Sequence, residues 1–504
     1  MRSLMKSCAG RKPSNATPSS PLRDVLSGLA HYAARVRQTL ERELKLTPSD
    51  GFRLSDLGVE LPSRDFVSTY YDTPELKLAR HDITLRHRSE EGSGLWQLKV
   101  PRGAARIELE VAGTPARPPS DLVALLFAHL RGHEPVRVAR LRTRRKTVRT
   151  DGAEIVEDAV AVLDGQRITS RFRELEVELV DGGDERTLQR LEKALRRAGA
   201  ASAEFRPKLF RALNLSPSTR RPALTADAAF SDVLVAALVD QHDRLLAHDP
   251  GTRLGSDPED LHQMRVATRR ARAFLRAAEP LLDSEWADDW RDELRWIGSA
   301  LGPARDLDVL IDRLGGEIAR LGDERRAVRG MLEGLERERR KARAVVVSVL
   351  SEERYPRLLD RLETPEPRLA TEARRTLAEL WWTEFGRTRR AFGRLDDDSS
   401  DDELHAARIK VKRSRYAAEL AAHELGLPGE RFVDAAKALQ DVLGEHQDAF
   451  VAEERIRAWS DDRREADDAV RKLLKWERAR RRKARAEWPQ AWRLLDRRAR
   501  KARP

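Results

Sequence analysis

Charged and apolar residues alternate in short stretches throughout the first part of this chain of 504 residues. Examples are Leu40–Leu46, Arg106–Val111, Arg142–Lys146 and Glu174–Leu179. Side chains of a strand point alternately to opposite faces, so each stretch predicts a strand with one charged face. For a single strand, the simple interpretation is a solvated face. Several such strands, some acidic and some basic, favour a closed antiparallel barrel whose polar lumen brings the opposite charges together.

A lumen of this kind is suited to a compact polyanion. Arginine binds phosphate oxygens through two hydrogen bonds, and lysine adds a point charge. Paired glutamates would repel phosphate unless a cation lies between them, and Mg²⁺ or Mn²⁺ prefers such hard oxygen ligands. Metal ions and basic residues together promote phosphoryl transfer without a nucleophilic side chain. The sequence accordingly offers no convincing Ser/His/Asp or Cys/His set and no Walker A loop.

The composition excludes several classes of protein. Lysine and arginine number 96 against 84 acidic residues, and the net charge of +12 favours a polyanionic partner. The single cysteine, Cys8, excludes a disulfide framework and a cysteine-based zinc site. No apolar run approaches the roughly 18 residues of a membrane helix, and the N-terminus shows no secretory signal. We therefore expect a cytoplasmic, multidomain protein without a membrane partner.

An ordered series of motifs in the strand region resembles the CYTH domain, the triphosphate tunnel family. The series opens with the E-x-E-x-K pattern of Glu41-Arg42-Glu43-Leu44-Lys45. Its later members are Tyr70–Pro74, Leu85–Arg88, Trp96–Pro101, Arg106–Glu110, Arg142–Arg144, Asp164–Gly165 and Glu174–Glu178. The resemblance implies an eight-stranded antiparallel tunnel with flanking helices. It also implies hydrolysis of inorganic triphosphate or thiamine triphosphate, or adenylate cyclisation.

The same resemblance implies roles for individual residues. Catalytic roles are implied for Glu41, Glu43 and Lys45. Phosphate binding is implied for Lys45, Arg86, Arg88, Lys99, Arg142, Arg144 and Lys208, although Pro207 stands before Lys208 where the family usually has serine. Binding of Mg²⁺ or Mn²⁺ is implied for Glu41, Glu43, Glu108, Glu110, Glu176 and Glu178. We interpret Glu174 as structural, with its neighbour Arg173 as a surface partner.

A change from strand patterns to helix patterns divides the chain. We expect a peripheral leader over residues 1–38 and a tunnel domain over residues 39–215. Residues 216–226 contain two prolines and a Ser-Pro-Ser-Thr stretch, and they predict a linker. Residues 227–504 predict an all-α domain made of two repeats, about 227–365 and 370–504. The fold class is therefore α+β, with a β tunnel followed by duplicated helical bundles.

The duplication is visible as one motif, H-x-x-R-x-x-x-[RK]-R-x-R, that occurs at His262 and again at His405. A Leu-Gly pair at Leu301 recurs at Leu443, and Lys341–Ala344 recurs at Lys483. Three matches in register indicate two homologous bundles. Asp257 followed by Pro258, and Ser400 with Glu403, predict the starts of the two helices that carry the motif.

In each repeat the motif places a histidine and three basic residues on one helix face. This half of the chain resembles the CHAD domain, in which two helical bundles face each other and basic residues line the groove between them. The resemblance implies binding of inorganic polyphosphate by His262, Arg265, Arg269, Arg272, Arg305, His405, Arg408, Lys412 and Arg415. Arg305 has an uncharged counterpart, Gln447, so the two halves need not bind equally.

The sequence as a whole predicts a metal-dependent triphosphatase joined to a polyphosphate-binding domain that tethers a long chain. Its partners would be short triphosphates and inorganic polyphosphate. One alternative is a protein that only binds polyphosphate or associates with polyphosphate granules. Adenylate cyclisation is a second alternative. Nucleic acid is the weakest, because no row of aromatic residues is interleaved with the basic ones.

Overall fold

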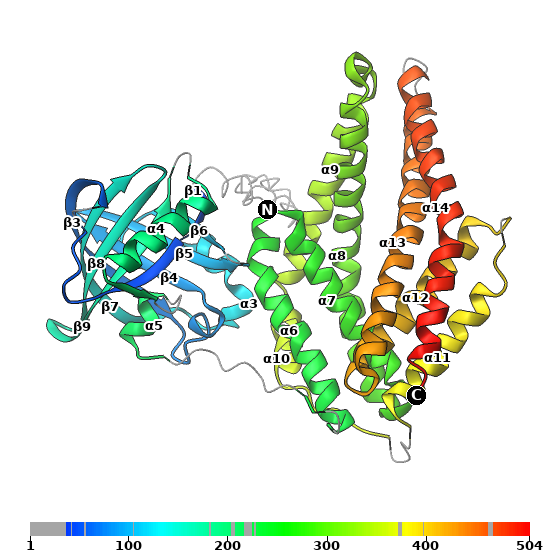
Figure 1. The fold of residues 1–504 in the computed structure, drawn as a ribbon, viewed down its shortest axis with the longest axis horizontal. Coiled ribbons are helices and arrows are strands. Elements are labelled where there is room, and N and C mark those ends of the chain that lie inside the picture. Colours follow the sequence, from blue (N-terminus) through cyan, green and yellow to red (C-terminus); the bar gives the residue numbers. More distant parts are fainter. Residues whose placement is uncertain are drawn as a thin grey trace, which may run out of the picture.

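The computed structural model describes residues 37–504 apart from 42, 55–56, 104, 181–182, 203–206, 216–223, 226–227, 371–374, 397 and 462–466. Nearly all of the predicted leader and most of the predicted linker lie outside the described residues. The β region and the helical region occupy opposite ends of the molecule (Figure 1). Among the described residues, no helix has the length and apolarity that a bilayer crossing requires.

The N-terminal part is one antiparallel sheet, in which the strand order is β1-β6-β5-β4-β3-β7-β8-β9-β2-β10. Its strands are β1 (Arg37–Glu41), β2 (Glu43–Pro48), β3 (Val59–Asp72), β4 (Thr84–Glu90), β5 (Ser93–Arg102), β6 (Ala105–Ala112), β7 (Val136–Thr150), β8 (Ala153–Asp164), β9 (Arg167–Leu179) and β10 (Ala200–Ser202). Only residue 42 separates β1 from β2, and they pair with β6 and β9 respectively, so the sheet closes on itself. With β1 and β2 taken as one strand, the ring has the predicted eight strands, and short β10 extends it.

Short helices cover the outer face of the barrel, as expected from its apolar residues. They are η2 (Ala79–His81), α2 (Ser120–Leu125), α3 (Phe127–Leu130) and α4 (Glu185–Arg197); a further short helix, α5 (Lys208–Ala212), follows β10. Helix α4 begins at the N-cap Asp184, whose side chain accepts a hydrogen bond from the Thr187 amide. Its apolar face packs Leu188, Leu191 and Leu195 against the outward-facing apolar residues of the neighbouring strands. Charged side chains of those strands are thereby left to face the lumen.

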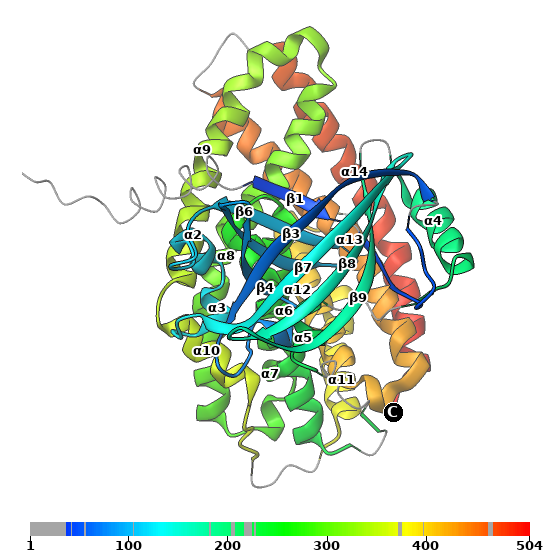
Figure 2. The same ribbon diagram turned by 90° about the vertical axis from the view of Figure 1, so that its left-hand side faces the viewer.

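Helix α5 plays a different part, because it closes one end of the barrel. Leu209 and Phe210 of α5 pack against Tyr70, Leu141 and Val160, which come from three different strands. This apolar plug leaves the charged part of the lumen as a pocket. In Figure 2 the barrel lies in front of the helical domain, and α5 is seen at its lower edge.

The C-terminal part is all-α. Its elements are α6 (Phe230–Leu254), α7 (Pro258–Ala277), η3 (Glu279–Leu281), α8 (Ser284–Ala319), η4 (Gly322–Glu324), α9 (Arg325–Leu350), α10 (Arg354–Glu363), α11 (Leu377–Phe392), α12 (Asp401–Leu420), α13 (Ala422–Ser460) and α14 (Asp467–Lys501). A single large core joins residues from both repeats, including Phe274, Trp381 and Tyr416. The long pairs α8–α9 and α13–α14 project side by side in Figure 1 and share a second core near their tips.

The internal duplication is reproduced in the helix boundaries. Helix α12 begins and ends 143 residues after α7, since 258 and 277 become 401 and 420. Helix α14 begins 142 residues after α9. The predicted caps are present: the Asp257 side chain accepts from the Glu259 amide, and Ser400 with Glu403 forms a capping box. The two domains are joined by ion pairs from Arg102, the last residue of β5, to Asp257 and Asp260 at the start of α7.

Candidate functional site

The barrel encloses a pocket of about 240 Å³ that is lined almost wholly by charged and polar side chains. The strand register explains why the charges meet there. Lys45 on β2 lies opposite Glu176 on β9, and Lys99 on β5 lies opposite Glu108 on β6. Each strand contributes every second residue to the lumen, as the alternation in the sequence predicts. The predicted residues that line this pocket are Glu43, Lys45, Arg86, Arg88, Lys99, Glu108, Glu110, Glu176, Glu178 and Lys208.

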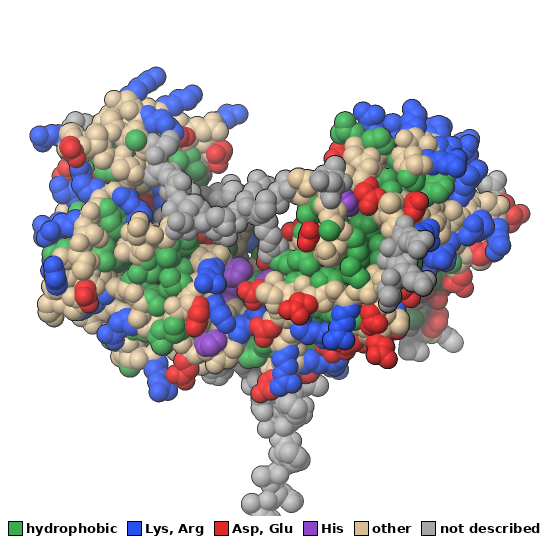
Figure 3. Space-filling view, turned by 90° about the horizontal axis from the view of Figure 1, so that it is seen from below, with side chains coloured by type: hydrophobic (Ala, Val, Ile, Leu, Met, Phe, Trp, Pro, Cys, Tyr) green, Lys and Arg blue, Asp and Glu red, His purple; other side chains and the backbone are tan. Residues whose placement is uncertain are grey.

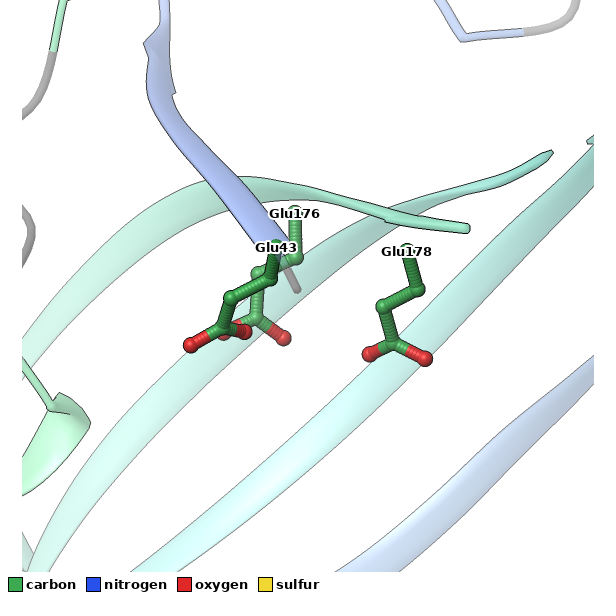
Figure 4. A group of neighbouring side chains, drawn as sticks. All are labelled: Glu43, Glu176 and Glu178. Atoms are coloured by element: carbon green, nitrogen blue, oxygen red, sulfur yellow. The ribbon is translucent and has the colours of Figure 1, made fainter. Parts of the chain in front are cut away.

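Three glutamates form a group whose ligand oxygens lie within 4.8 Å of one another. Glu43 comes from β2, and Glu176 and Glu178 come from the neighbouring β9 (Figure 4). In that view their carboxylates extend to the same side of the two strands. Such a set of hard oxygen ligands fits Mg²⁺ or Mn²⁺. The side chain of Glu41, which was predicted to join this group, lies outside the described residues.

Two lysines neutralise the deeper carboxylates. The Lys45 Nζ lies 2.6 Å from Glu176 Oε1 and 3.5 Å from Glu43 Oε1. Burial alone would lower the pKa of Lys45, but Glu176 and Glu43 outweigh it and the pKa is raised. Burial likewise opposes charge on Glu176, but Lys208, Lys45 and Arg145 hold its pKa well below the usual value. Glu176 is therefore ionised despite its burial, with Lys45 and Lys208 on one oxygen and Arg145 on the other.

Lys208 stands at the centre of a second acidic group. Its ammonium lies 2.6 Å from Glu174 Oε1, 2.9 Å from Glu176 Oε1 and 3.0 Å from Asp158 Oδ2. The lysine occupies the position that a metal ion would take between these three carboxylates. The interpretation of Glu174 as a surface residue paired with Arg173 is wrong, because Arg173 pairs with Glu157 and Glu174 is buried. Register places Glu174 on the lumen face two residues from Glu176.

On the opposite wall, Gln97 connects the basic and acidic residues. Its amide donates to Glu108 Oε1 at 3.0 Å and to Glu110 Oε1 at 2.7 Å. Its carbonyl oxygen accepts from Arg86 Nε at 2.9 Å. Gln97 therefore uses all its polar atoms to hold this glutamate pair beside the Arg86 guanidinium. The sequence gives a weak signal for it, since Gln97 has the same strand parity as Lys99.

Three arginines, Arg86, Arg88 and Arg145, concentrate positive charge in the same pocket as the carboxylates. Burial, together with the charges of Arg86 and Arg145, lowers the pKa of Arg88 to about 10. The guanidinium of Arg88 packs over the Phe66 ring, 3.7 Å from its centroid, and pairs with Glu90. An anion bound among these arginines would relieve their mutual repulsion. The wall thus gathers positive charge beside an acidic group that fits a metal ion.

The prediction that Arg142 and Arg144 of strand β7 face the lumen is wrong. Arg142 and Arg144 are exposed on the outer surface, and Arg144 pairs there with Asp65 at 3.2 Å. The inward residues are the odd-numbered ones, and Arg145 lines the pocket, with Nη2 at 2.7 Å from Asp158 Oδ2. Leu141 also points inward because the apolar plug around α5 fills that end of the barrel. Because the apolar Leu141 faces the lumen together with Arg145, the alternation of apolar and charged residues in β7 does not indicate which face is inward.

The basic stripes of the two helical repeats meet in a second cavity of about 810 Å³. The predicted residues that line it are His262, Arg265, Arg269, Arg305, His405, Arg408, Lys412 and Arg415. Arg272 is the exception, because it lies near Arg295 and Arg276 and does not line the cavity. Arg313 and Lys437 also line it, although the motif gave no sign of them. They come from α8 and α13, which form the walls beside α7 and α12.

Charge repulsion is strong in this cavity. Burial, followed by the charges of Arg408, Arg269 and Arg265, lowers the pKa of Lys412 to about 7. Burial and Arg305 also lower the pKa of His262. His405 Nδ1 lies 2.8 Å from the Gln447 side-chain oxygen, so the residue that lacks charge in the second repeat contacts the motif histidine instead. A polyanion would compensate the unbalanced charge.

The basic run Arg478–Arg485 on α14 is engaged within the domain. Arg478 and Arg481 pair with buried Glu453, and Arg481 and Arg485 pair with Asp401 at the start of α12. On the face shown in Figure 3, basic side chains are scattered over both lobes, with acidic ones between them. This run is therefore less available to an external polyanion than the basic residues of the helical cavity.

Comparisons with known proteins bear on both halves of the chain. The CYTH domain model matches residues 38–205, and the CHAD domain model matches residues 236–457. The uncharacterized protein Rv2226 of Mycobacterium tuberculosis is 31% identical over 438 residues, which are 78% of this chain and 82% of that protein. Human thiamine-triphosphatase is 46% identical over 71 residues, 14% of this chain and 29% of that enzyme. The solved CHAD domain of the plant Ricinus communis is 25% identical, covers 55% of this chain and 95% of its own, and gives a TM-score of 0.44.

Proposed function

This chain belongs to the proteins that join a CYTH domain to a CHAD domain, and we propose that it hydrolyses short triphosphates in the tunnel and binds inorganic polyphosphate in the helical cavity. The observation that carries the first part is the group of Glu43, Glu176 and Glu178 beside a wall of arginines and lysines. The substrate class is inorganic triphosphate or a related triphosphate. The local similarity to a thiamine-triphosphatase supports the same chemistry.

In this proposal the basic residues bind and orient the phosphates. Arg86, Arg88 and Arg145 offer paired donors to the phosphate oxygens, and Lys45 and Lys99 add point charges. Glu43, Glu176 and Glu178 would hold Mg²⁺ or Mn²⁺, which would supply Lewis-acid chemistry to the phosphoryl group and to water. Gln97 lies between Arg86 and the two glutamates Glu108 and Glu110 and is hydrogen-bonded to all three, so it holds the glutamates in place beside the site. The plug at α5 restricts entry to one end, so a long chain presents its terminus.

The helical half would act as a tether. A polyphosphate chain held by the cationic cavity has a terminus at raised effective concentration near the tunnel. Ion pairs from Arg102 to Asp260 and from Arg131 to Asp360 join the two domains. They would hold the tethered chain beside the domain that contains the tunnel. We propose residues 39–215 as the catalytic unit and residues 227–504 as the tethering unit.

Phosphate release from tripolyphosphate, thiamine triphosphate, ATP and long-chain polyphosphate tests the enzyme function, measured with Mg²⁺, with Mn²⁺ and with chelator. We expect metal-dependent release from tripolyphosphate. Glu43→Ala should reduce turnover by about a hundredfold or more while the full chain still binds long polyphosphate. Glu134→Ala, at an exposed loop position, is the matched control. No release from any substrate, with polyphosphate binding intact, would favour the alternative of a protein that only binds polyphosphate.

A further inference from the structure

The duplication places chemically equivalent residues in two different environments within one cavity. Arg265 and Arg269 of α7 correspond to Arg408 and Lys412 of α12, each 143 residues later. A symmetric cavity would offer two equal sites for phosphate groups. The contacts of these four residues differ between the repeats, and the difference predicts where a polyanion is held.

In the first repeat, the leading arginine is already satisfied by acceptors of the protein. Arg265 Nη1 donates to the backbone oxygen of Gly302 at 3.0 Å and to Asp306 Oδ1 at 2.6 Å. An incoming phosphate would have to replace these bonds and would meet the charge of Asp306. The Arg265–Asp306 pair is partly exposed, so its own stability is modest, but it neutralises this end of the cavity.

In the second repeat, the equivalent cations lack such acceptors. Within the part of the chain that the structure describes, neither Arg408 nor Lys412 forms a hydrogen bond or an ion pair, and the Arg408 Nε is buried without a partner. Asp448 is the counterpart of Asp306 and lines the cavity, but it forms no ion pair with Arg408. Buried donors without acceptors are costly unless a ligand supplies the acceptors.

The glycine beside each arginine explains the difference in part. A Cβ atom at Gly444 would lie 3.0 Å from Arg408 Nη2, so the guanidinium packs directly over this glycine. At the equivalent Gly302 a Cβ would have no contact within 4 Å, and the arginine instead bonds to the glycine's carbonyl oxygen. The Arg408 guanidinium therefore lies over the helix surface with its donors unused.

Arg269 of the first repeat lies between the two environments. Its Nε donates to the Tyr416 hydroxyl of α12 at 2.9 Å, which draws it towards the second repeat. The positive charges of Arg408 and Arg269 are among the groups that act on Lys412, together with the opposing charge of Asp448. The three cations Arg269, Arg408 and Lys412 thus converge with little compensation.

We infer that the cavity is asymmetric and that a polyphosphate is anchored at the subsite of Arg408 and Lys412, with Arg269 contributed by the other repeat. This inference rests on the proposed polyphosphate-binding function and adds the location of its strongest contact. Arg265 then acts as a secondary contact, which engages phosphate only after release of Asp306. The phosphate oxygens supply the acceptors that Arg408 lacks.

The duplication provides matched variants for the test, in the full chain. Arg408→Gln is compared with Arg265→Gln by calorimetric titration with tripolyphosphate and with long-chain polyphosphate. We expect Arg408→Gln to weaken binding by about tenfold or more, and Arg265→Gln by less than about threefold. Equal losses, or a larger loss for Arg265→Gln, would overturn the asymmetry while leaving polyphosphate binding intact.

Two further measurements keep the outcomes distinct. Absence of binding by the unmodified chain would overturn the proposed function itself, not the location of the anchor. Arg408→Lys and Arg265→Lys keep the charge, so they decide the matter if a glutamine variant unfolds, as monitored by circular dichroism. Arg408→Lys should then still lose more affinity than Arg265→Lys, because lysine cannot reproduce the two-pronged contact with phosphate.

Discussion

The ammonium of Lys208 lies 2.6 Å from the Glu174 carboxylate, inside a barrel end that α5 seals. Asp158 and Glu176 also contact this ammonium, so one lysine pairs with three carboxylates in the interior, and Arg145 and Lys45 supply further positive charge to them. Burial opposes charge on Lys208, but Glu176, Asp158 and Glu174 raise its pKa well above the usual value. Lys208 therefore remains a cation, and it fixes the depth to which a substrate phosphate or a metal ion can enter the pocket.

Replacement of Lys208 by methionine should destabilise the fold in a pH-dependent way. Asp158 and Glu176 have lowered pKa values in the folded protein, and Lys208 is the largest charge that lowers them. Without it, burial is opposed only by the remaining charges of Arg145 and Lys45, and the folded pKa values of both carboxyls rise. The variant should lose about 3 kcal/mol at neutral pH, and less as the pH falls and the carboxylates become protonated. Thermal unfolding of both proteins across the acidic range checks this, and a deficit that does not shrink on acidification would contradict it.

Arginine side chains on β7 should differ sharply in their effect on turnover. Arg145→Gln removes a cation that lines the pocket, whereas Arg144→Gln removes an exposed one that pairs with Asp65. We expect Arg145→Gln to raise the KM for tripolyphosphate by about tenfold or more and Arg144→Gln to change it by less than about twofold. Steady-state kinetics on the two neighbours measures the difference. A larger effect at Arg144 would restore the face of the strand that the sequence predicted.

The sequence predicted most of the tunnel because alternation in a strand fixes which residues share a face. Glu43, Lys45, Glu176 and Glu178 meet as expected, and so do Lys99 and Glu108. The strand that failed is β7, where inward Leu141 belongs to the plug and two adjacent arginines, Arg144 and Arg145, make either parity plausible. Asp158 was missed for a related reason, since its role depends on the register between β8 and β7.

In the helical half, the helices and their basic stripes could be predicted better than the contacts within the cavity. Repetition of one motif located both stripes, and the helix boundaries follow the same offset. Arg272 lies outside the cavity although it shares the stripe, because the cavity spans only the part of α7 that faces α12 and α8. The environments of Arg265 and Arg408 could not be predicted, because they depend on distances to Asp306 and Gly444 from other helices.

Substitution of Glu178 should weaken metal binding far more than it lowers the stability of the fold. Glu178→Gln keeps the shape of the side chain and removes one charge from the group that includes Glu43 and Glu176. We expect the affinity for Mn²⁺ to fall by about tenfold to a hundredfold with little change in melting temperature. Titration of Mn²⁺ followed by electron paramagnetic resonance measures this without turnover. Glu185→Gln, on the exposed first turn of α4, is the control. Unchanged Mn²⁺ affinity would place the metal elsewhere.

Binding of long polyphosphate should weaken as the pH rises through the pKa of Lys412. Burial and the neighbouring charges of Arg408, Arg269 and Arg265 lower this pKa to about 7, against the opposing charge of Asp448. A bound polyanion favours the ammonium, so binding takes up a proton above that pH and the affinity falls by up to about tenfold per pH unit. The internal phosphates of a long chain stay ionised throughout, which isolates the protein's contribution. Lys412→Arg should flatten the profile, and an unchanged slope in that variant would assign the proton to another group.

Alanine at the two equivalent glycines should have different consequences for polyphosphate binding. In α8, Gly302→Ala meets no neighbour within 4 Å, so it should keep the affinity and stabilise the helix by about 0.5–1 kcal/mol. In α13, Gly444→Ala would bring its Cβ to 3.0 Å from Arg408 Nη2 and displace the guanidinium. The side chain is flexible, so stability should change little, while the affinity falls by about threefold or more as Arg408 loses its place over the helix. Thermal unfolding and calorimetric titration of the two variants measure both effects, and an equal loss of affinity in the two would show that Arg408 does not need its position over Gly444 to bind phosphate.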